Sequence, residues 1–174
     1  TLYYDETLPD FSDYNMKDRT YRYIHENPWK PFGFGLTYSK TVYKKLHLDP
    51  DTMEISFEAE NVGNIDIEEV YQIYIDRCPS EKLENGQNQQ YTQILDASNQ
   101  PKYSLSGFGR VSLKAGEQRR ISHKLEPRAL ETVLEDGSRA LLKGQYTVFA
   151  GGSQPDTYSQ QLSDTVCLKM TLTL

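Results

Sequence analysis

Apolar and polar residues alternate in several short segments after about residue 40. Residues 53–60 (MEISFEAE) are apolar at every second position, which is the period of a β-strand with one buried face. Residues 70–75 (VYQIYI) are β-branched or aromatic at every position except Gln72, which also favours a strand. The residues predicted to face inward from these two segments are Met53, Ile55, Phe57, Ala59, Tyr71, Ile73 and Ile75.

The same pattern continues to the end of the chain. Strands are predicted around Val111, around Ile121, over residues 144–152 and over residues 166–174, with turn signals at 61–64 and 114–117. One helical turn at most is expected, at 127–131. Turns spaced about ten residues apart predict an antiparallel β-sandwich of seven to eight strands. Its predicted core includes Ile55, Phe57, Ile73, Leu125, Val148 and Leu168.

The first 43 residues differ from the rest of the chain. They hold 11 of the 20 aromatic residues, few aliphatic ones, and neither helical nor strand periodicity. Such a segment needs another surface to cover its rings, so it is interpreted as a linker wrapped over a domain boundary. A sugar-binding platform around Trp29 is the alternative. The candidate domain-interface or sugar contacts are Tyr21, Tyr23, Trp29, Phe32 and Phe34.

Residues 79–101 interrupt the strand pattern with a polar stretch between Pro79 and Pro101. The stretch is long for a loop of a sandwich, and loops of this length are usually functional or mobile. We expect it to be mobile without neighbours and to extend toward another domain.

Charge adds one constraint on strand pairing. The net charge of −6 argues against nucleic acid as a partner, and no apolar run reaches the length of a membrane span. Residues 46–76 are acidic and residues 110–128 basic. This contrast predicts that the two segments pair, with Arg120 and Lys124 facing Glu54, Glu58 and Glu60.

No catalytic or cofactor site is predicted. Hydrolysis of a glycoside needs two carboxyl groups across a sugar, whereas Glu58 and Glu60 share an outward strand face and the adjacent Glu68 and Glu69 point to opposite faces. No nucleophile elbow, phosphate-binding glycine loop or metal-ligand spacing is present in the sequence. His123 is expected at the core edge. Cys78 and Cys167 are expected to be free thiols.

Three blocks of the linker resemble glycoside hydrolase family 3. They are residues 8–16 (LPDFSDYNM), 19–23 (RTYRY) and 31–39 (PFGFGLTYS), which match the family's D-Y-x-M, R-T-Y-R-Y and P-F-G-Y-G-L-S-Y-T in order and spacing. The resemblance continues through residues 61–63 (NVG), 70–75, 105–111 (LSGFGRV), 113–117 (LKAGE) and 144–148 (GQYTV).

The resemblance implies an all-β, immunoglobulin/fibronectin type III-like sandwich over 40–174, whose Tyr146 stands at the tyrosine corner. It implies that 1–39 form a linker and the last strand of a missing α/β sandwich domain. Family members are retaining β-glucosidases or β-xylosidases. Their nucleophile and acid/base lie in a TIM barrel and that α/β domain, and no motif here matches either.

The expected function is therefore that of a non-catalytic C-terminal accessory domain, which braces those two catalytic domains. A carbohydrate-binding module that uses Trp29 or the 79–101 loop is the alternative.

Overall fold

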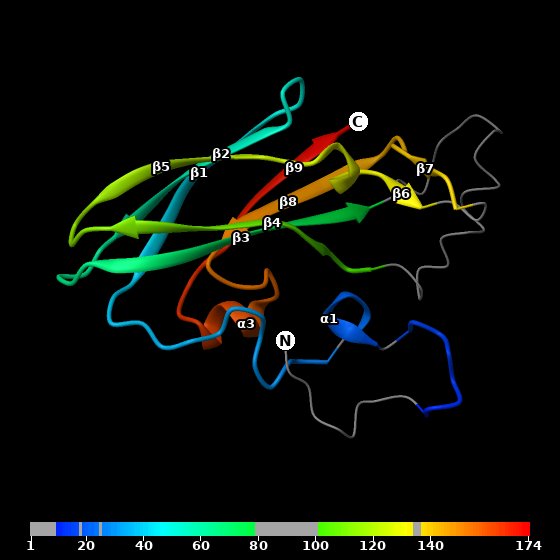
Figure 1. Cartoon of the computed structure of the whole chain (residues 1–174), viewed down its shortest axis with the longest axis horizontal. Coiled ribbons are helices and arrows are strands. Elements are labelled where there is room, and N and C mark those ends of the chain that lie inside the picture. Colours follow the sequence, from blue (N-terminus) through cyan, green and yellow to red (C-terminus); the bar gives the residue numbers. More distant parts are fainter. Residues whose placement is uncertain (1–9, 18, 25, 79–100, 134–136) are drawn as a thin grey trace.

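The computed structural model describes residues 10–17, 19–24, 26–78, 101–133 and 137–174. Two antiparallel sheets pack face to face in it (Figure 1). The first has the order β1-β2-β5, formed by β1 (Thr41–Asp49), β2 (Glu54–Asn61) and β5 (Gln118–Lys124). The second has the order β4-β3-β8-β9, formed by β4 (Ser104–Leu113), β3 (Ile67–Cys78), β8 (Gln145–Gly151) and β9 (Leu168–Thr173). The predicted all-β antiparallel sandwich is confirmed.

Short elements complete the described part of the chain. A two-stranded ribbon joins β6 (Thr132–Val133) and β7 (Arg139–Ala140), and the predicted helical turn is the 3-10 helix η3 (Pro127–Ala129). Two short α-helices, α1 (Thr20–Tyr23) and α3 (Thr157–Leu162), were not predicted. Asp156 caps α3, since its Oδ1 accepts a hydrogen bond of 2.7 Å from the backbone N–H of Ser159.

The core lies between the sheets and follows the alternation in the sequence. Every residue predicted for the core is fully buried except Leu168, which is partly buried against it. Leu168 lies on β9, an edge strand with a neighbour on one side only, which explains its exposure. Predicted structure at residues 1–5 and 79–100 falls outside the described residues.

The charged strands pair as predicted, with a different set of contacts. Glu54 lies opposite Lys124 and Glu58 opposite Arg120, whereas Glu60 lies opposite Gln118. Glu60 and Glu58 form their ion pairs with residues of β1 instead, Glu60 with Lys44 and Glu58 with Lys45. The guanidinium of Arg120 donates to Ser56 Oγ at 3.0 Å.

Two polar side chains fix the ends of the sandwich. The Tyr146 hydroxyl donates to the carbonyl of Leu142, four residues upstream, as in a tyrosine corner. Asn61 is fully buried, and its amide donates to the carbonyls of Ile65 at 2.7 Å and Lys114 at 3.1 Å. Asn61 thereby ties the turn after β2 to the turn before β5, which explains the asparagine of the N-x-G motif.

Candidate interdomain surface

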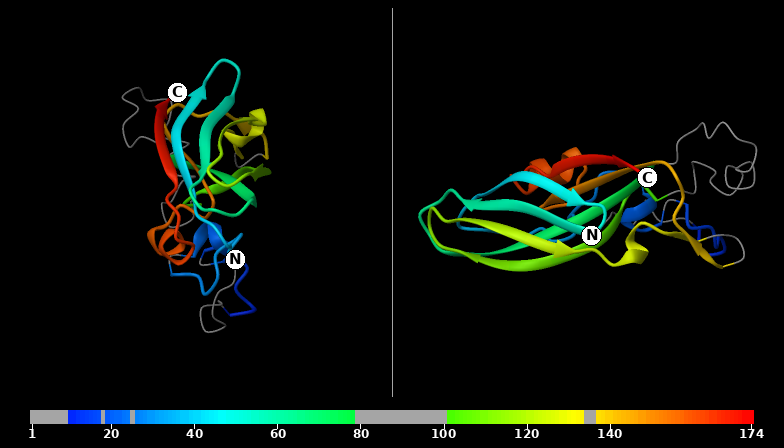
Figure 2. Two further views of the ribbon diagram at one scale, coloured as in Figure 1. Left: turned by 90° about the vertical axis from the view of Figure 1, so that its left-hand side faces the viewer. Right: turned by 90° about the horizontal axis from the view of Figure 1, so that it is seen from above.

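The middle of β3, in the second sheet, is buried on both faces. Tyr71, Ile73 and Ile75 of β3 point into the core, so Gln72 and Tyr74 point away from it. Both would be solvent-exposed in a bare sandwich, yet each is only 1% exposed. The linker, with α1 and residues 26–40, lies on this side of the sandwich together with α3 (Figures 1 and 2).

Three tyrosines form the first contact between linker and sheet. The ring of Tyr74 meets Tyr21 of α1 edge-on at 6.4 Å between centroids, and Tyr103 at 5.4 Å. The Tyr21 hydroxyl accepts a hydrogen bond of 2.9 Å from the backbone N–H of Leu105, at the start of β4. Burial, together with Tyr21 and Tyr103, raises the pKa of Tyr74 far above its ordinary value. Tyr74 is therefore neutral at any physiological pH.

Two buried glutamines hold the linker backbone at Phe32. Gln154 Oε1 accepts from the Phe32 N–H at 3.0 Å, and Gln72 Nε2 donates to the Phe32 carbonyl at 3.3 Å. The next residue, Gly33, has φ = 77°, and a Cβ there would collide with Gln72 Nε2. A hydrogen bond of 3.1 Å from Phe34 N–H to the Pro31 carbonyl closes this turn. The turn thus accounts for the P-F-G motif, since its third residue must be glycine.

The opposite side of the linker is open. Leu36 is 99% exposed and Tyr38 90% exposed, and about half of Trp29 and of Phe32 is also exposed. We call these four residues the linker surface. Apolar side chains this exposed indicate a contact surface.

The five predicted contact residues lie in different environments. Tyr21 turns inward onto Tyr74, so it holds the linker and is not available to a partner. Tyr23 is half-buried, with the guanidinium of Arg22 at 5.7 Å from its ring centroid. Trp29 and Phe32 are exposed, whereas Phe34 is half-buried.

Lys30 joins two of these rings. Its ammonium lies 4.1 Å from the ring centroid of Phe34 and 5.8 Å from that of Trp29. Such a cation holds the two rings together, and it occupies a face of Phe34 on which a sugar would have to stack. The arrangement favours a protein contact over a sugar platform.

Sequence reasoning missed Gln72, Gln154 and Tyr103. A glutamine in a strand carries no sign that it will be covered, because its polar side chain suits a solvent-facing position. Both amides bind the backbone of Phe32, which comes from a distant part of the chain, and this contact could not be read from the local sequence.

The four carboxylates considered for catalysis are each engaged in the fold. Glu58 accepts 2.9 Å hydrogen bonds from Lys45 and Gln118, and Lys44 pairs with Glu60. Glu68 and Glu69 point to opposite faces of β3, as predicted because they are adjacent in sequence. Glu68 accepts from the Ser112 hydroxyl, while Glu69 accepts from the Tyr43 hydroxyl at 2.6 Å.

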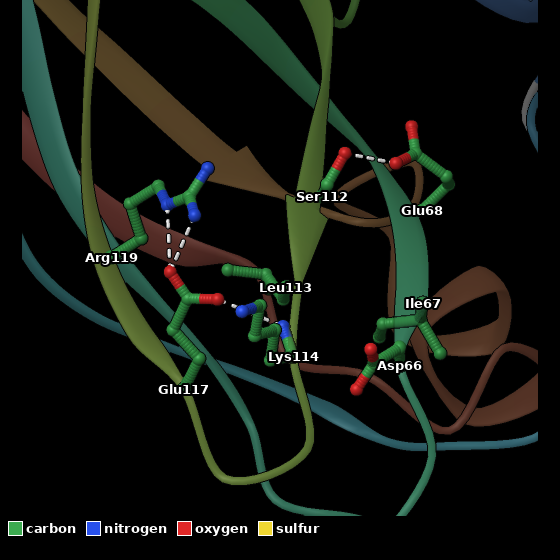
Figure 3. Close-up of a pocket in the computed structure, with 8 residues that line it drawn as sticks. All are labelled: Asp66, Ile67, Glu68, Ser112, Leu113, Lys114, Glu117 and Arg119. Atoms are coloured by element: carbon green, nitrogen blue, oxygen red, sulfur yellow. Dashed lines mark hydrogen bonds and ion pairs between the residues drawn. The ribbon is translucent and has the colours of Figure 1, made fainter.

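An open groove of about 340 Å³ lies beside the β4–β5 turn (Figure 3). It is lined by Asp66, Ile67, Glu68, Ser112, Leu113, Lys114, Glu117 and Arg119. Its acidic groups bind their own neighbours: the backbone N–H of Lys114 and the guanidinium of Arg119 both donate to Glu117 and hold the pKa of that carboxyl below its ordinary value. A carboxyl with a lowered pKa cannot serve as a general acid near neutral pH.

The histidine and cysteine positions also belong to the fold. His123 lies at the core edge as predicted, with its Nδ1 at 3.3 Å from the Tyr71 hydroxyl. Cys167 is a free, buried thiol, as predicted, whose Sγ lies 3.2 Å from the Ser153 carbonyl oxygen; the side chain of Cys78 lies outside the described part. Within the described residues, no group of His, Cys, Asp or Glu is arranged to hold a metal ion, and no helix has the length and apolarity needed to cross a bilayer.

Comparisons with known proteins place this architecture in a family. The family profile of the fibronectin type III-like domain matches residues 88–154. A xylan 1,4-β-xylosidase of Xylanibacter ruminicola is 29% identical over 167 residues, which are 93% of this chain and 17% of that protein. A thermostable β-glucosidase B of Acetivibrio thermocellus is 25% identical over 148 residues, 78% of this chain and 17% of that protein.

A solved structure agrees. The GH3 β-glucosidase of Bifidobacterium adolescentis superposes with a TM-score of 0.61 at 25% identity, covering 83% of this chain and 18% of that one. The fold and the matches define a fibronectin type III-like β-sandwich domain. The resemblance seen in the linker motifs is confirmed: the chain matches the fibronectin type III-like domain, and its relatives are β-glucosidases and β-xylosidases of glycoside hydrolase family 3. The chain spans only 17% of the length of these two curated relatives.

Proposed function

We propose that this chain is a non-catalytic accessory domain of a family 3 glycosidase, in which it braces the catalytic domains. In this proposal residues 1–39 are the linker, 40–174 are the sandwich, and the partners are the TIM-barrel and α/β sandwich domains of the parent enzyme. The parent hydrolyses β-glucosides or β-xylosides, as the names of its relatives suggest.

The two-sided linker carries this proposal. One side is fastened to the sheet by Tyr21 and by the glutamines that bind the Phe32 backbone, and the other presents the linker surface to solvent. Burying a fully exposed leucine such as Leu36 is worth about 1.5–3 kcal/mol. A partner that covers the whole linker surface would therefore gain several such contributions without having to order the backbone first.

The engaged carboxylates support the absence of catalysis. A retaining glycosidase needs two carboxyl groups about 5 Å apart facing one sugar. Here Glu58 and Glu60 are bound to lysines, and Glu68 and Glu69 face away from each other.

Activity assays on two proteins test the proposal. The complete polypeptide that contains this chain should hydrolyse an aryl β-glucoside or β-xyloside, and the 174-residue chain alone should not exceed the background rate. Turnover by the chain alone that disappears in Glu58→Gln or Glu68→Gln would overturn it. Titration of the chain with cellobiose and xylobiose, followed by Trp29 fluorescence, tests the carbohydrate-binding alternative, which requires saturable binding.

A further inference from the structure

A second apolar patch lies on the same outer face of the sheet as the linker. Phe108 of β4 is 66% exposed, and Val70 of β3 is 39% exposed. In the register of the two strands, Phe108 lies opposite Gln72, and Val70 lies opposite Arg110. We call Val70, Phe108 and Arg110 the sheet patch.

The sheet patch adjoins the linker surface through Gln72. This glutamine lies beside Phe108 in the sheet, and its side chain holds the Phe32 carbonyl. The two phenylalanines therefore flank one buried amide, one from the sheet and one from the linker.

The fold itself keeps Phe108 outside. Its neighbours Gly107 and Gly109 face inward, where a Cβ would collide with the ring of His123 and with the Tyr71 hydroxyl. Those two side chains occupy the space under β4, so the strand cannot turn over to bury the phenylalanine. The G-F-G sequence thus presents an aromatic ring to solvent on a rigid strand.

The chemistry of the combined surface fits a protein. Leu36 and Val70 are aliphatic, and aliphatic side chains offer a sugar no flat face for stacking. Arg110 forms no ion pair with any described residue, although the chain carries a net charge of −6. An arginine beside exposed aromatic rings is the composition found at the centre of protein interfaces.

We propose that the linker surface and the sheet patch form one continuous contact surface for a folded region of the same polypeptide, a region with an apolar recess for Phe108 and a carboxylate facing Arg110. The relatives are several times longer than this chain, which leaves room for such a region. The inference rests on the proposed function and extends its docking site from the linker to β4.

Chemical labelling of introduced cysteines tests this surface directly. Phe108→Cys, Leu36→Cys and the control Leu141→Cys, which is 56% exposed outside both patches, are each made in the 174-residue chain and in the complete polypeptide. The rate of reaction with a maleimide is measured for each, with the unsubstituted proteins as background for Cys78 and Cys167. Circular dichroism confirms that each variant is folded.

We expect Phe108→Cys and Leu36→Cys to react at least about tenfold more slowly in the complete polypeptide than in the chain alone, because labelling then requires undocking. Leu141→Cys should react equally fast in both. Protection of Leu36→Cys without protection of Phe108→Cys would overturn the extension to β4 and leave the proposed function standing. Protection of neither would overturn both, and protection that appears only after adding an oligosaccharide would make the occupant a glycan.

Arg110 provides an independent check. Arg110→Gln in the complete polypeptide should accelerate labelling of Phe108→Cys several-fold, because it leaves the facing carboxylate unpaired. The same substitution in the 174-residue chain should leave that rate unchanged. If Arg110→Gln leaves the labelling rate of Phe108→Cys unchanged in the complete polypeptide as well, a carboxylate partner for Arg110 is contradicted.

Discussion

The side-chain amide of Gln72 donates a hydrogen bond of 3.3 Å to the main-chain carbonyl of Phe32, although 40 residues separate the two in sequence. Gln154 holds the N–H of the same residue, so both backbone polar groups of Phe32 are satisfied by side chains of the sandwich, one from β3 and one from the segment after β8. The linker is in this way a structural part of the sandwich. Four predictions test how the sandwich holds together.

Gly33→Ala should lower the free energy of unfolding of the 174-residue chain by about 1–3 kcal/mol, because alanine resists the positive φ of this position and its Cβ would displace Gln72. Urea denaturation measures the change. Gly35→Ala is the matched control, since nothing lies within 4 Å of a Cβ there. Equal effects at the two glycines would show that the turn does not need its close contact with Gln72.

Gln72→Leu should be destabilising by about 1–3 kcal/mol, because it leaves the Phe32 carbonyl and the Tyr74 hydroxyl without their partner. Trp29 fluorescence should shift at the same time if the linker loosens. Gln118→Leu, at an exposed position of β5, should change stability by less than about 0.5 kcal/mol. A stable Gln72→Leu variant with unchanged fluorescence would mean that the linker is held by its rings alone.

Asn61→Ala should lower the free energy of unfolding by about 2–3 kcal/mol, because it leaves the buried carbonyls of Ile65 and Lys114 without the amide that binds them. The exposed Asn64, three residues later, supplies the control Asn64→Ala, for which little change is expected. Thermal unfolding followed by circular dichroism distinguishes the two. A similar melting temperature for both variants would argue that water replaces the Asn61 amide.

Stability should fall on mild acidification because of His123. Burial lowers its pKa in the folded chain below the ordinary 6.5, so the unfolded chain binds more protons than the folded chain as the pH falls through that value. The destabilisation is absent well above pH 6.5, grows below it, and is complete once the pH is below the folded pKa. Asp76 acts in the opposite direction, because burial raises its pKa and its protonation favours the folded chain.

Comparison with His123→Gln isolates the histidine, since the contribution of Asp76 is common to both proteins. Urea unfolding at pH 7.5, 6.5 and 5.5 should show a smaller loss of stability on acidification for His123→Gln than for the unsubstituted chain. Parallel curves for the unsubstituted chain and His123→Gln would exclude this role of His123.

The buried faces of β2 and β3 could be read from the sequence, and so could one strand pairing, whereas no strand was predicted over β1. Ile55 and Phe57 alternate with glutamates, and that alternation correctly gave the core. The contrast of acidic and basic segments correctly placed Glu54 opposite Lys124. Both inferences work because they depend on local period and on pairwise charge.

The covered outer face could not be read in this way. Gln72 and Tyr74 lie on the side of β3 that alternation assigns to solvent, and their burial depends on a linker without periodicity of its own. The sequence pattern also gave Tyr21 and Trp29 the same role, as aromatic contacts for a partner. Only the three-dimensional arrangement shows that the first holds the linker and the second is exposed.

The way the linker lies over β3 bears on how such a domain can be moved between proteins. Cutting the chain at residue 40 would preserve every strand of the two sheets, yet it would remove the Phe32 carbonyl that binds the Gln72 amide and the Tyr21 ring that meets Tyr74. The unit that can be transplanted intact therefore begins before α1, inside what strand counting would assign to a connector. Gene fusion or recombination at the strand boundaries alone would transfer a sandwich in which the outer face of β3 lacks its linker cover.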